Sequence, residues 1–176
     1  MKLITSESVN IGHPDKTCDI IADAFLDEAL KQDKYSQMAV ECAIKNNKLF
    51  IYGEATTKAK LNYSKIAKEV LKEIGYKNNF KIIKEISVQS PDIHGAVCKD
   101  KIMANDQGII FGYATDETNN FMPLPICIAH RLMKVYNEYR RLNNQFMPDA
   151  KGQVTVEYDD NDIPKRIDTV VVSVSH

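Results

Sequence analysis

Residues 38–55, MAVECAIKNNKLFIYGEA, constrain the fold more strongly than any other part of the chain. Met38, Val40, Cys42 and Ile44 alternate with residues of the opposite face, a pattern typical of a strand with one buried side. Two asparagines then fit a two-residue turn, and a second strand follows them. The stretch therefore predicts a β-hairpin.

The expected register of this hairpin brings charged side chains together. A two-residue turn places Lys45 opposite Lys48 and Glu41 opposite Tyr52, with Glu54 diagonal to Glu41 on the same, partly apolar face. Two interpretations of these carboxylates stay open at this point. The face is exposed and both groups are hydrated, or the two groups hold a cationic ligand or ion between them.

The stretch SVNIGHPDKTCDIIADAF, residues 8–25, predicts the start of a helix. Apolar residues recur at helical spacing from Ile20 and Ile21 to Leu30. Pro14 suits the first turn because its missing N–H is not needed there. Asp15 stands where the unpaired N–H groups and the helix dipole favour an anion.

Two interpretations of this helix start also stay open. In the simpler one, Asp15 caps the helix, Gly12 makes a turn and His13 is exposed. In the other, the helix N-terminus binds an anion. His13 and Lys16 then grip a phosphate, and Asp15 holds the metal ion that accompanies it.

The rest of the chain predicts alternating helices and strands. A helix with an apolar stripe from Ile66 to Ile74 stops at Gly75, and a strand over 80–89 follows. A long loop to residue 105 contains the expected domain boundary. A second unit then contains a strand over 108–115, a helix with Ile128, Leu132, Val135 and Tyr139 on one side, and a hairpin ending in a valine-rich strand.

The composition excludes several classes of protein. Apolar content of 44% and charged content of 27% are typical of a globular chain, and a net charge of -1 argues against nucleic acid as a partner. The first residues lack the apolar core of a signal peptide, and no run is long enough to cross a bilayer. Four scattered cysteines without a CxxC pair argue against zinc and favour reduced thiols in a cytoplasmic protein.

Six separated motifs resemble, in order, those of S-adenosylmethionine synthetase (methionine adenosyltransferase). They are SESVNIGHPDK, YGEATT, QSPDI, DQGIIFGYATDET, MPLPICIAHRLMK and PDAKGQVTVEYDD. The resemblance extends through the first of the family's three similar domains and about half of the second. It implies an α+β fold of sheet-and-helix layers, with an N-terminal domain over 1–92, a mobile gate loop or linker over 93–105 and a partial central domain over 106–176.

The resemblance also implies a reaction. Family members join L-methionine to ATP, release the triphosphate, and split it into phosphate and pyrophosphate with the help of Mg²⁺ and K⁺. Attack of a neutral sulfur on carbon needs alignment and stabilisation of the leaving polyphosphate more than acid or base chemistry. The implied oligomer is either a homo-oligomer or a hetero-oligomer with a chain that carries the family's C-terminal half.

Roles for individual residues follow from the same resemblance. His13 and Lys151 are the expected catalytic contacts to the polyphosphate. Asp15 is the expected Mg²⁺ ligand and Glu41 the expected K⁺ ligand. The expected methionine-binding residues are Glu54, Gln89 and Asp106. The expected nucleotide-binding residues are His13, Asp149, Ala150 and Lys151.

The chain departs from the family pattern at two places. Tyr52-Gly53 stands where the family usually has Gly-Gly, and Met103-Ala104-Asn105 stands where it usually has Gly-Ala-Gly. The family's later phosphate-binding elements do not occur in this sequence. We therefore expect little S-adenosylmethionine from the chain alone. A non-catalytic, dimerising or regulatory synthetase-like protein and a truncated fragment stay open as alternatives to one part of a split enzyme.

Overall fold

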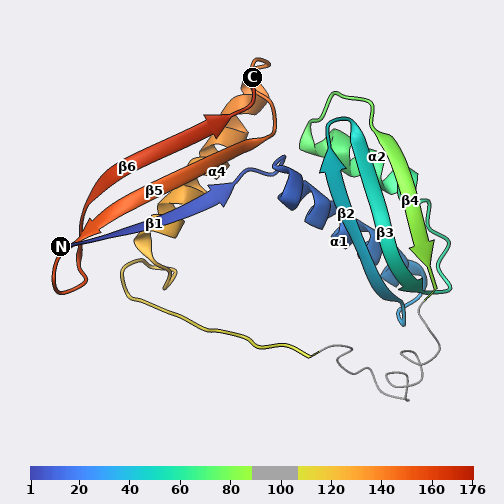
Figure 1. Cartoon of the computed structure of the whole chain (residues 1–176), viewed down its shortest axis with the longest axis horizontal. Helices are drawn as coiled ribbons and strands as arrows, with labels where there is room; N and C mark the ends of the chain where they lie inside the picture. The colour runs from blue at the N-terminus through green and yellow to red at the C-terminus, as the bar shows by residue number, and fades with distance from the viewer. Residues whose placement is uncertain (89–106) are drawn as a thin grey trace. The chain divides into compact units, whose positions relative to one another are not determined.

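The computed structural model describes residues 1–88 and 107–176 (Figure 1). The strands are β1 (Lys2–Val9), β2 (Gln37–Lys45), β3 (Lys48–Thr56), β4 (Lys81–Ser87), β5 (Ala150–Tyr158) and β6 (Pro164–Val174). The helices are α1 (Pro14–Gln32), α2 (Tyr63–Ile74) and α4 (Leu124–Leu142). This mixture of sheets and helices confirms the α+β class.

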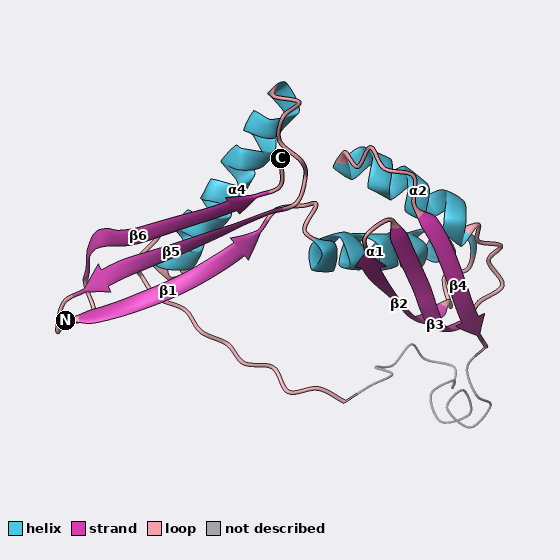
Figure 2. Ribbon diagram, turned by 45° about the horizontal axis from the view of Figure 1, so that its top comes forward, coloured by secondary structure: helices cyan, strands magenta, loops and turns pink. Residues whose placement is uncertain are grey.

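The first of two compact units is discontinuous in sequence. It combines Met1–Lys16, Ile74–Tyr76 and Phe111–His176. Its antiparallel sheet has the order β1-β5-β6, and α4 packs along β1 and β5 on one face of that sheet (Figure 2). The core between helix and sheet consists of Ala129, Val154, Val156 and Tyr158.

One strand was missed in the sequence analysis and one was predicted wrongly. β1 was not predicted, and the strand predicted over 108–115 is wrong, because those residues form no regular structure. The side chains of Ile109, Ile110 and Phe111 are 83%, 96% and 91% exposed. The described strands pair only in the orders β1-β5-β6 and β2-β3-β4, so residues 108–115 have no strand partner, and an unpaired strand with exposed apolar side chains is not stable.

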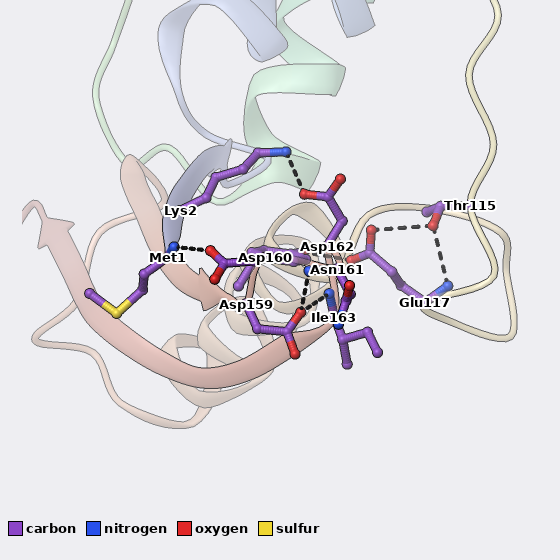
Figure 3. Close-up of polar contacts among 10 residues, drawn as sticks. Met1, Lys2, Thr115, Glu117, Asp159, Asp160, Asn161, Asp162 and Ile163 are labelled. Atoms are coloured by element: carbon purple, nitrogen blue, oxygen red, sulfur yellow. Dashed lines mark hydrogen bonds and ion pairs between the residues drawn. The ribbon is translucent and has the colours of Figure 1, made fainter.

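The turn between β5 and β6 is ordered by its own carboxylates and by the N-terminus (Figure 3). Asp159 accepts hydrogen bonds from the backbone N–H groups of Asn161 and Ile163, at 2.9 and 3.0 Å. Its ion pair with Lys165, together with these bonds, lowers the pKa of Asp159 to about 2. Lys2 pairs with Asp162 at 2.8 Å, so the start of β1 is tied to this turn.

The second unit comprises Thr17–Glu73 and the described residues between Lys77 and Ile110. Its sheet has the order β2-β3-β4, with an antiparallel β2–β3 hairpin and a parallel β3–β4 pair. The parallel pair needs a long crossover, which α2 supplies. Phe25 of α1 meets Tyr63 of α2 edge to face, with ring centroids 4.9 Å apart.

The predicted hairpin register is confirmed in full. Lys45 lies opposite Lys48, Glu41 opposite Tyr52, and Ala39 opposite Glu54. The turn has two residues, and Asn46 adopts a φ of 52°. Asparagine tolerates this left-handed conformation better than most residues, which explains its position in the turn.

The buried faces of the two long helices differ in part from the predictions. In α1, Ile21 and Phe25 are buried as expected, but Leu30 is 42% exposed, so its predicted inward position is wrong. In α4, Val135 and Tyr139 are 46% and 53% exposed. The buried stripe of α4 instead includes Ala129, Met133 and Arg140.

The described cysteines are free thiols, of which Cys18 is buried and Cys42 and Cys127 are partly buried. Cys18, Cys42 and Cys127 are reduced, and Cys98 lies outside the described residues. Burial raises the pKa of the Cys42 thiol to about 12, and the nearby Cys18 and Glu41 add to this shift.

Within residues 1–88 and 107–176, no helix is both long and apolar enough to cross a membrane.

Candidate functional site

The segment between β1 and α1, residues 10–13, is held in a compact turn, here called the His13 loop. The backbone N–H of His13 donates to the carbonyl of Asn10 at 3.0 Å. The backbone N–H of Asn10 donates in turn to the carbonyl of Ala150 at 2.9 Å. The Asn10 side-chain amide donates to the carbonyl of Pro148 at 2.7 Å, and the residue is only 3% exposed.

These bonds fasten the His13 loop to the start of β5. In the β1–β5 ladder, Val9 lies opposite Lys151. A Cβ atom at Gly12 would overlap both the ring and the backbone of Pro148, so only glycine fits this close approach. The fold therefore brings the residues just before His13 beside residues 148–151, which lie far away along the chain and include Asp149, Ala150 and Lys151.

The imidazole of His13 has a defined partner. Its Nδ1 accepts a hydrogen bond from the backbone N–H of Asp15 at 3.3 Å, and it lies 3.9 Å from an oxygen of the Asp15 carboxylate. An Nδ1 that accepts a hydrogen bond assigns the proton of the neutral ring to Nε2. His13 can thus offer an Nε2–H donor to a bound anion.

Asp15 occupies the first turn of α1, and its side chain is 91% exposed. Such a carboxylate suits Mg²⁺, which proteins often hold through one or two carboxylates together with substrate phosphates. Within the described ranges, 1–88 and 107–176, no group of three or more His, Cys, Asp or Glu side chains is arranged to hold a metal ion. A single exposed carboxylate such as that of Asp15 could hold Mg²⁺ only together with further ligands, such as phosphate oxygens.

Lys151 is paired with a residue that the sequence did not point to. Its Nζ lies 3.0 Å from a carboxylate oxygen of Glu7, across the β1–β5 ladder. Both side chains are about half exposed, at 45% and 56%, and a pair of this kind contributes little stability. An incoming phosphate can therefore compete with Glu7 for Lys151. Only the unpredicted β1–β5 pairing could have drawn attention to Glu7.

Residues 74–76, from another part of the chain, also contact the His13 loop. The hydroxyl of Tyr76 donates to the carbonyl of Gly12 at 2.5 Å. Two residues earlier, the carbonyl of Ile74 accepts a hydrogen bond from the guanidinium of Arg140 at 2.6 Å. Neither Tyr76 nor Arg140 was singled out from the sequence, since neither belongs to a charged motif.

His130 makes a structural contact near the same strand. Its Nδ1 lies 2.8 Å from the hydroxyl of Ser8, at the end of β1. This bond links α4 to the strand that precedes the His13 loop. This contact indicates a structural role for His130.

The carboxylates of Glu41 and Glu54 lie on one face of the second unit's sheet, as the hairpin register predicted. Glu41 is exposed and Glu54 is partly buried. Gly53 precedes Glu54 with a φ of 126°, and a Cβ atom there would overlap the carbonyl oxygen of Ala39. The position of Glu54 thus depends on a glycine before it.

Three of the expected features fall outside the described residues. They are Gln89, Asp106 and the gate loop over 93–105. Their roles stay predictions, as do the roles of Glu41 and Glu54 and the domain boundaries expected at residues 92, 93, 105 and 106.

Comparison with known proteins gives two matches to family models. Residues 1–106 match the model of the S-adenosylmethionine synthetase N-terminal domain, and residues 101–176 match that of the central domain. Similar curated proteins are named S-adenosylmethionine synthase. Those from Bacteroides thetaiotaomicron and Mesoplasma florum are each 46% identical over 188 residues, and that from Phocaeicola vulgatus is 45% identical over the same length. Each match covers 99% of this chain but only 44%, 49% and 44% of the relative, in that order. The chain thus spans a little under half the length of these relatives.

Proposed function

The chain belongs to the S-adenosylmethionine synthetase family, and from this we propose that it binds the polyphosphate of ATP and takes part in forming S-adenosylmethionine from ATP and L-methionine. The observation that carries the proposal is the attachment of the His13 loop to the segment Pro148–Lys151. It joins the two segments whose residues are expected to contact the polyphosphate.

The chemistry of this reaction matches the groups that the first unit offers. The triphosphate that leaves during attack by the methionine sulfur is strongly anionic, so donors and cations aimed at it stabilise the transition state. The Nε2–H of His13 and the ammonium of Lys151 are groups of this kind. Release of Lys151 from Glu7 would accompany phosphate binding.

Two ions are part of the proposal. Asp15 would hold Mg²⁺ together with the phosphates, and Glu41 would hold K⁺. When bound, the Mg²⁺ ion supplies neutralising charge to the polyphosphate. Glu54, with Gln89 and Asp106, would bind methionine, with the Glu54 carboxylate facing the ammonium group.

The first test measures binding of inorganic tripolyphosphate to the chain by calorimetry, with and without Mg²⁺. Asp15→Asn should weaken binding about tenfold or more in the presence of Mg²⁺ and change little without it, because the substitution removes a metal ligand. Asp19→Asn is a matched control, since Asp19 is an exposed carboxylate one turn further along α1. Equal Mg²⁺ titrations for the wild type and Asp15→Asn would remove Asp15 from the site.

The proposed active species contains further protein. We expect a homo-oligomer, or a hetero-oligomer with a chain that supplies the remaining length of the relatives, and we expect weak or no product formation without it. Product formation from ATP and methionine, assayed with and without such a second polypeptide, separates one part of an enzyme from a non-catalytic binding protein. Tripolyphosphate binding without any product in the combined assay would favour the binding protein.

A further inference from the structure

The His13 loop lies outside regular secondary structure, so side-chain bonds add to the few backbone bonds that fix its conformation. Two such bonds reach it from residues with no expected role in binding. The amide of Asn10 donates to the Pro148 carbonyl at 2.7 Å, and the hydroxyl of Tyr76 donates to the Gly12 carbonyl at 2.5 Å. We propose that Asn10 and Tyr76 are positioning residues, which hold the His13 loop in the conformation that binds polyphosphate.

The Tyr76 contact has a rigid base. Ile74 is the last residue of α2, and Gly75, which follows it, adopts a φ of 105° that lets the chain turn there. Arg140 is only 7% exposed, and its guanidinium donates to the Ile74 carbonyl at 2.6 Å and to the Asn137 side chain at 2.9 Å. The Arg140 guanidinium thus holds Ile74 in place, and Ile74 lies only two residues before Tyr76. This contact helps to fix the position of the Tyr76 phenol.

The Asn10 contact is equally constrained. The side chain is 3% exposed, so the Pro148 carbonyl has little access to water as a substitute donor. The backbone N–H of Asn10 also donates to Ala150, which gives one residue two bonds to the start of β5. Gly12, the residue immediately before His13, lies directly against Pro148. The carbonyl of Gly12 also accepts the hydrogen bond from the Tyr76 hydroxyl. The backbone that carries the His13 imidazole is therefore held both by the bonds of Asn10 to the start of β5 and by the bond from Tyr76.

This inference rests on the proposed function for the ligand, but the order of the loop can be measured without any ligand. Tyr76→Phe removes one hydroxyl and keeps the ring, so the chain should fold. Tyr158→Phe is the matched control, because it removes a phenol hydrogen bond of 2.6 Å, to Glu117, at the opposite end of β5. Asn10→Ala is a second, more severe variant.

The first measurement is the ¹⁵N order parameter of the His13 amide in the labelled chain. Tyr76→Phe should lower it below about 0.6, the range of a flexible backbone, while the amides of Val154 and Val156 in the core keep their wild-type values. Tyr158→Phe should leave His13 unchanged. An unchanged order parameter at His13 in both Tyr76→Phe and Asn10→Ala overturns the inference.

The second measurement is the affinity for tripolyphosphate with Mg²⁺. Tyr76→Phe should weaken binding about tenfold, and Tyr158→Phe should not, even if the two variants lose equal stability in urea. A loosened loop with wild-type affinity overturns the positioning role. If the wild-type chain binds no tripolyphosphate while the loop loosens in Tyr76→Phe, the proposed function fails and the role of Tyr76 in ordering the loop is supported.

Discussion

At the scale of single residues, Gly53 limits substitution next to a candidate methionine-binding side chain. Its φ of 126° lies in a region that L side chains rarely adopt, and the carbonyl of Ala39 closes the space where a Cβ would stand. The neighbouring Tyr52 is not among the described residues with positive φ, and it is 48% exposed. A side chain in place of the family's usual first glycine is therefore accommodated, whereas the second glycine is required.

Gly53→Ala should accordingly lower the free energy of unfolding by about 2–3 kcal/mol, since both backbone strain and a steric overlap are introduced. The measurement is urea denaturation. Gly108→Ala is the matched control, because a Cβ there meets no atom within 4 Å, and its effect should stay within about 0.5 kcal/mol. A similar loss in both variants would argue against the special role of Gly53.

At the scale of elements, α4 begins without a side-chain hydrogen bond from its N-cap residue, and the carboxylate of Glu117, seven residues before Leu124, accepts the hydrogen bond instead. Pro123 occupies the N-cap position, and Glu117 accepts hydrogen bonds from the N–H of Leu124 at 3.1 Å and from the hydroxyl of Tyr158 at 2.6 Å. Thr115 donates to the other carboxylate oxygen at 3.2 Å. Glu117 thus joins the start of the helix to the end of β5.

Partial burial of Glu117 opposes its charge, but the bonds from Tyr158, Leu124 and Thr115 outweigh it and lower the pKa of the carboxyl. A lowered pKa means that Glu117 contributes stability above the usual glutamate pKa of about 4.3 and loses it as the pH falls through the lowered value. Glu117→Gln should therefore be destabilised at pH 7 and should lose less further stability between pH 5 and pH 3 than the wild type. Urea midpoints at these pH values measure both effects, with Asp116→Asn as a neighbouring exposed control. Parallel pH curves for Glu117→Gln and the wild type would contradict the assignment.

The elements that the sequence predicts correctly are those whose contacts lie close along the chain. The hairpin of β2 and β3, the stripe of α2 and the stop at Gly75 depend on neighbours a few residues away, and all were predicted. β1 was missed because its partner is far along the chain, and residues 108–115 have the composition of a strand but pair with no described strand. The contacts of Glu7, Asn10 and Tyr76 in the candidate site were hidden for this reason, whereas the motif residue His13 was not.

At the scale of the whole molecule, β6 presents an apolar edge. It is the outer strand of its sheet among the described residues, and Val170, Val171 and Val172 are 47%, 50% and 47% exposed. Unpaired backbone groups beside exposed valines favour pairing with another chain.

We expect the purified chain to self-associate as its concentration rises, which sedimentation velocity can follow. Val171→Lys should shift the association to concentrations several-fold higher, because a charge on an edge strand opposes pairing. Asn144→Lys adds the same charge at an exposed position away from the sheet and should leave the association unchanged. A wild-type chain that stays monomeric over the whole range would contradict this expectation.

The pairing of β1 with β5 has a consequence for the order of folding. Thr5 and Thr155, whose hydroxyls are hydrogen-bonded across these strands, lie 150 positions apart. At common rates of synthesis, β1 leaves the ribosome roughly eight to thirty seconds before its partner strand. During that time the β2–β3 hairpin can already close locally. The pairing of β1 with β5 is therefore expected to be a slow, long-range step, and it also completes the His13 loop.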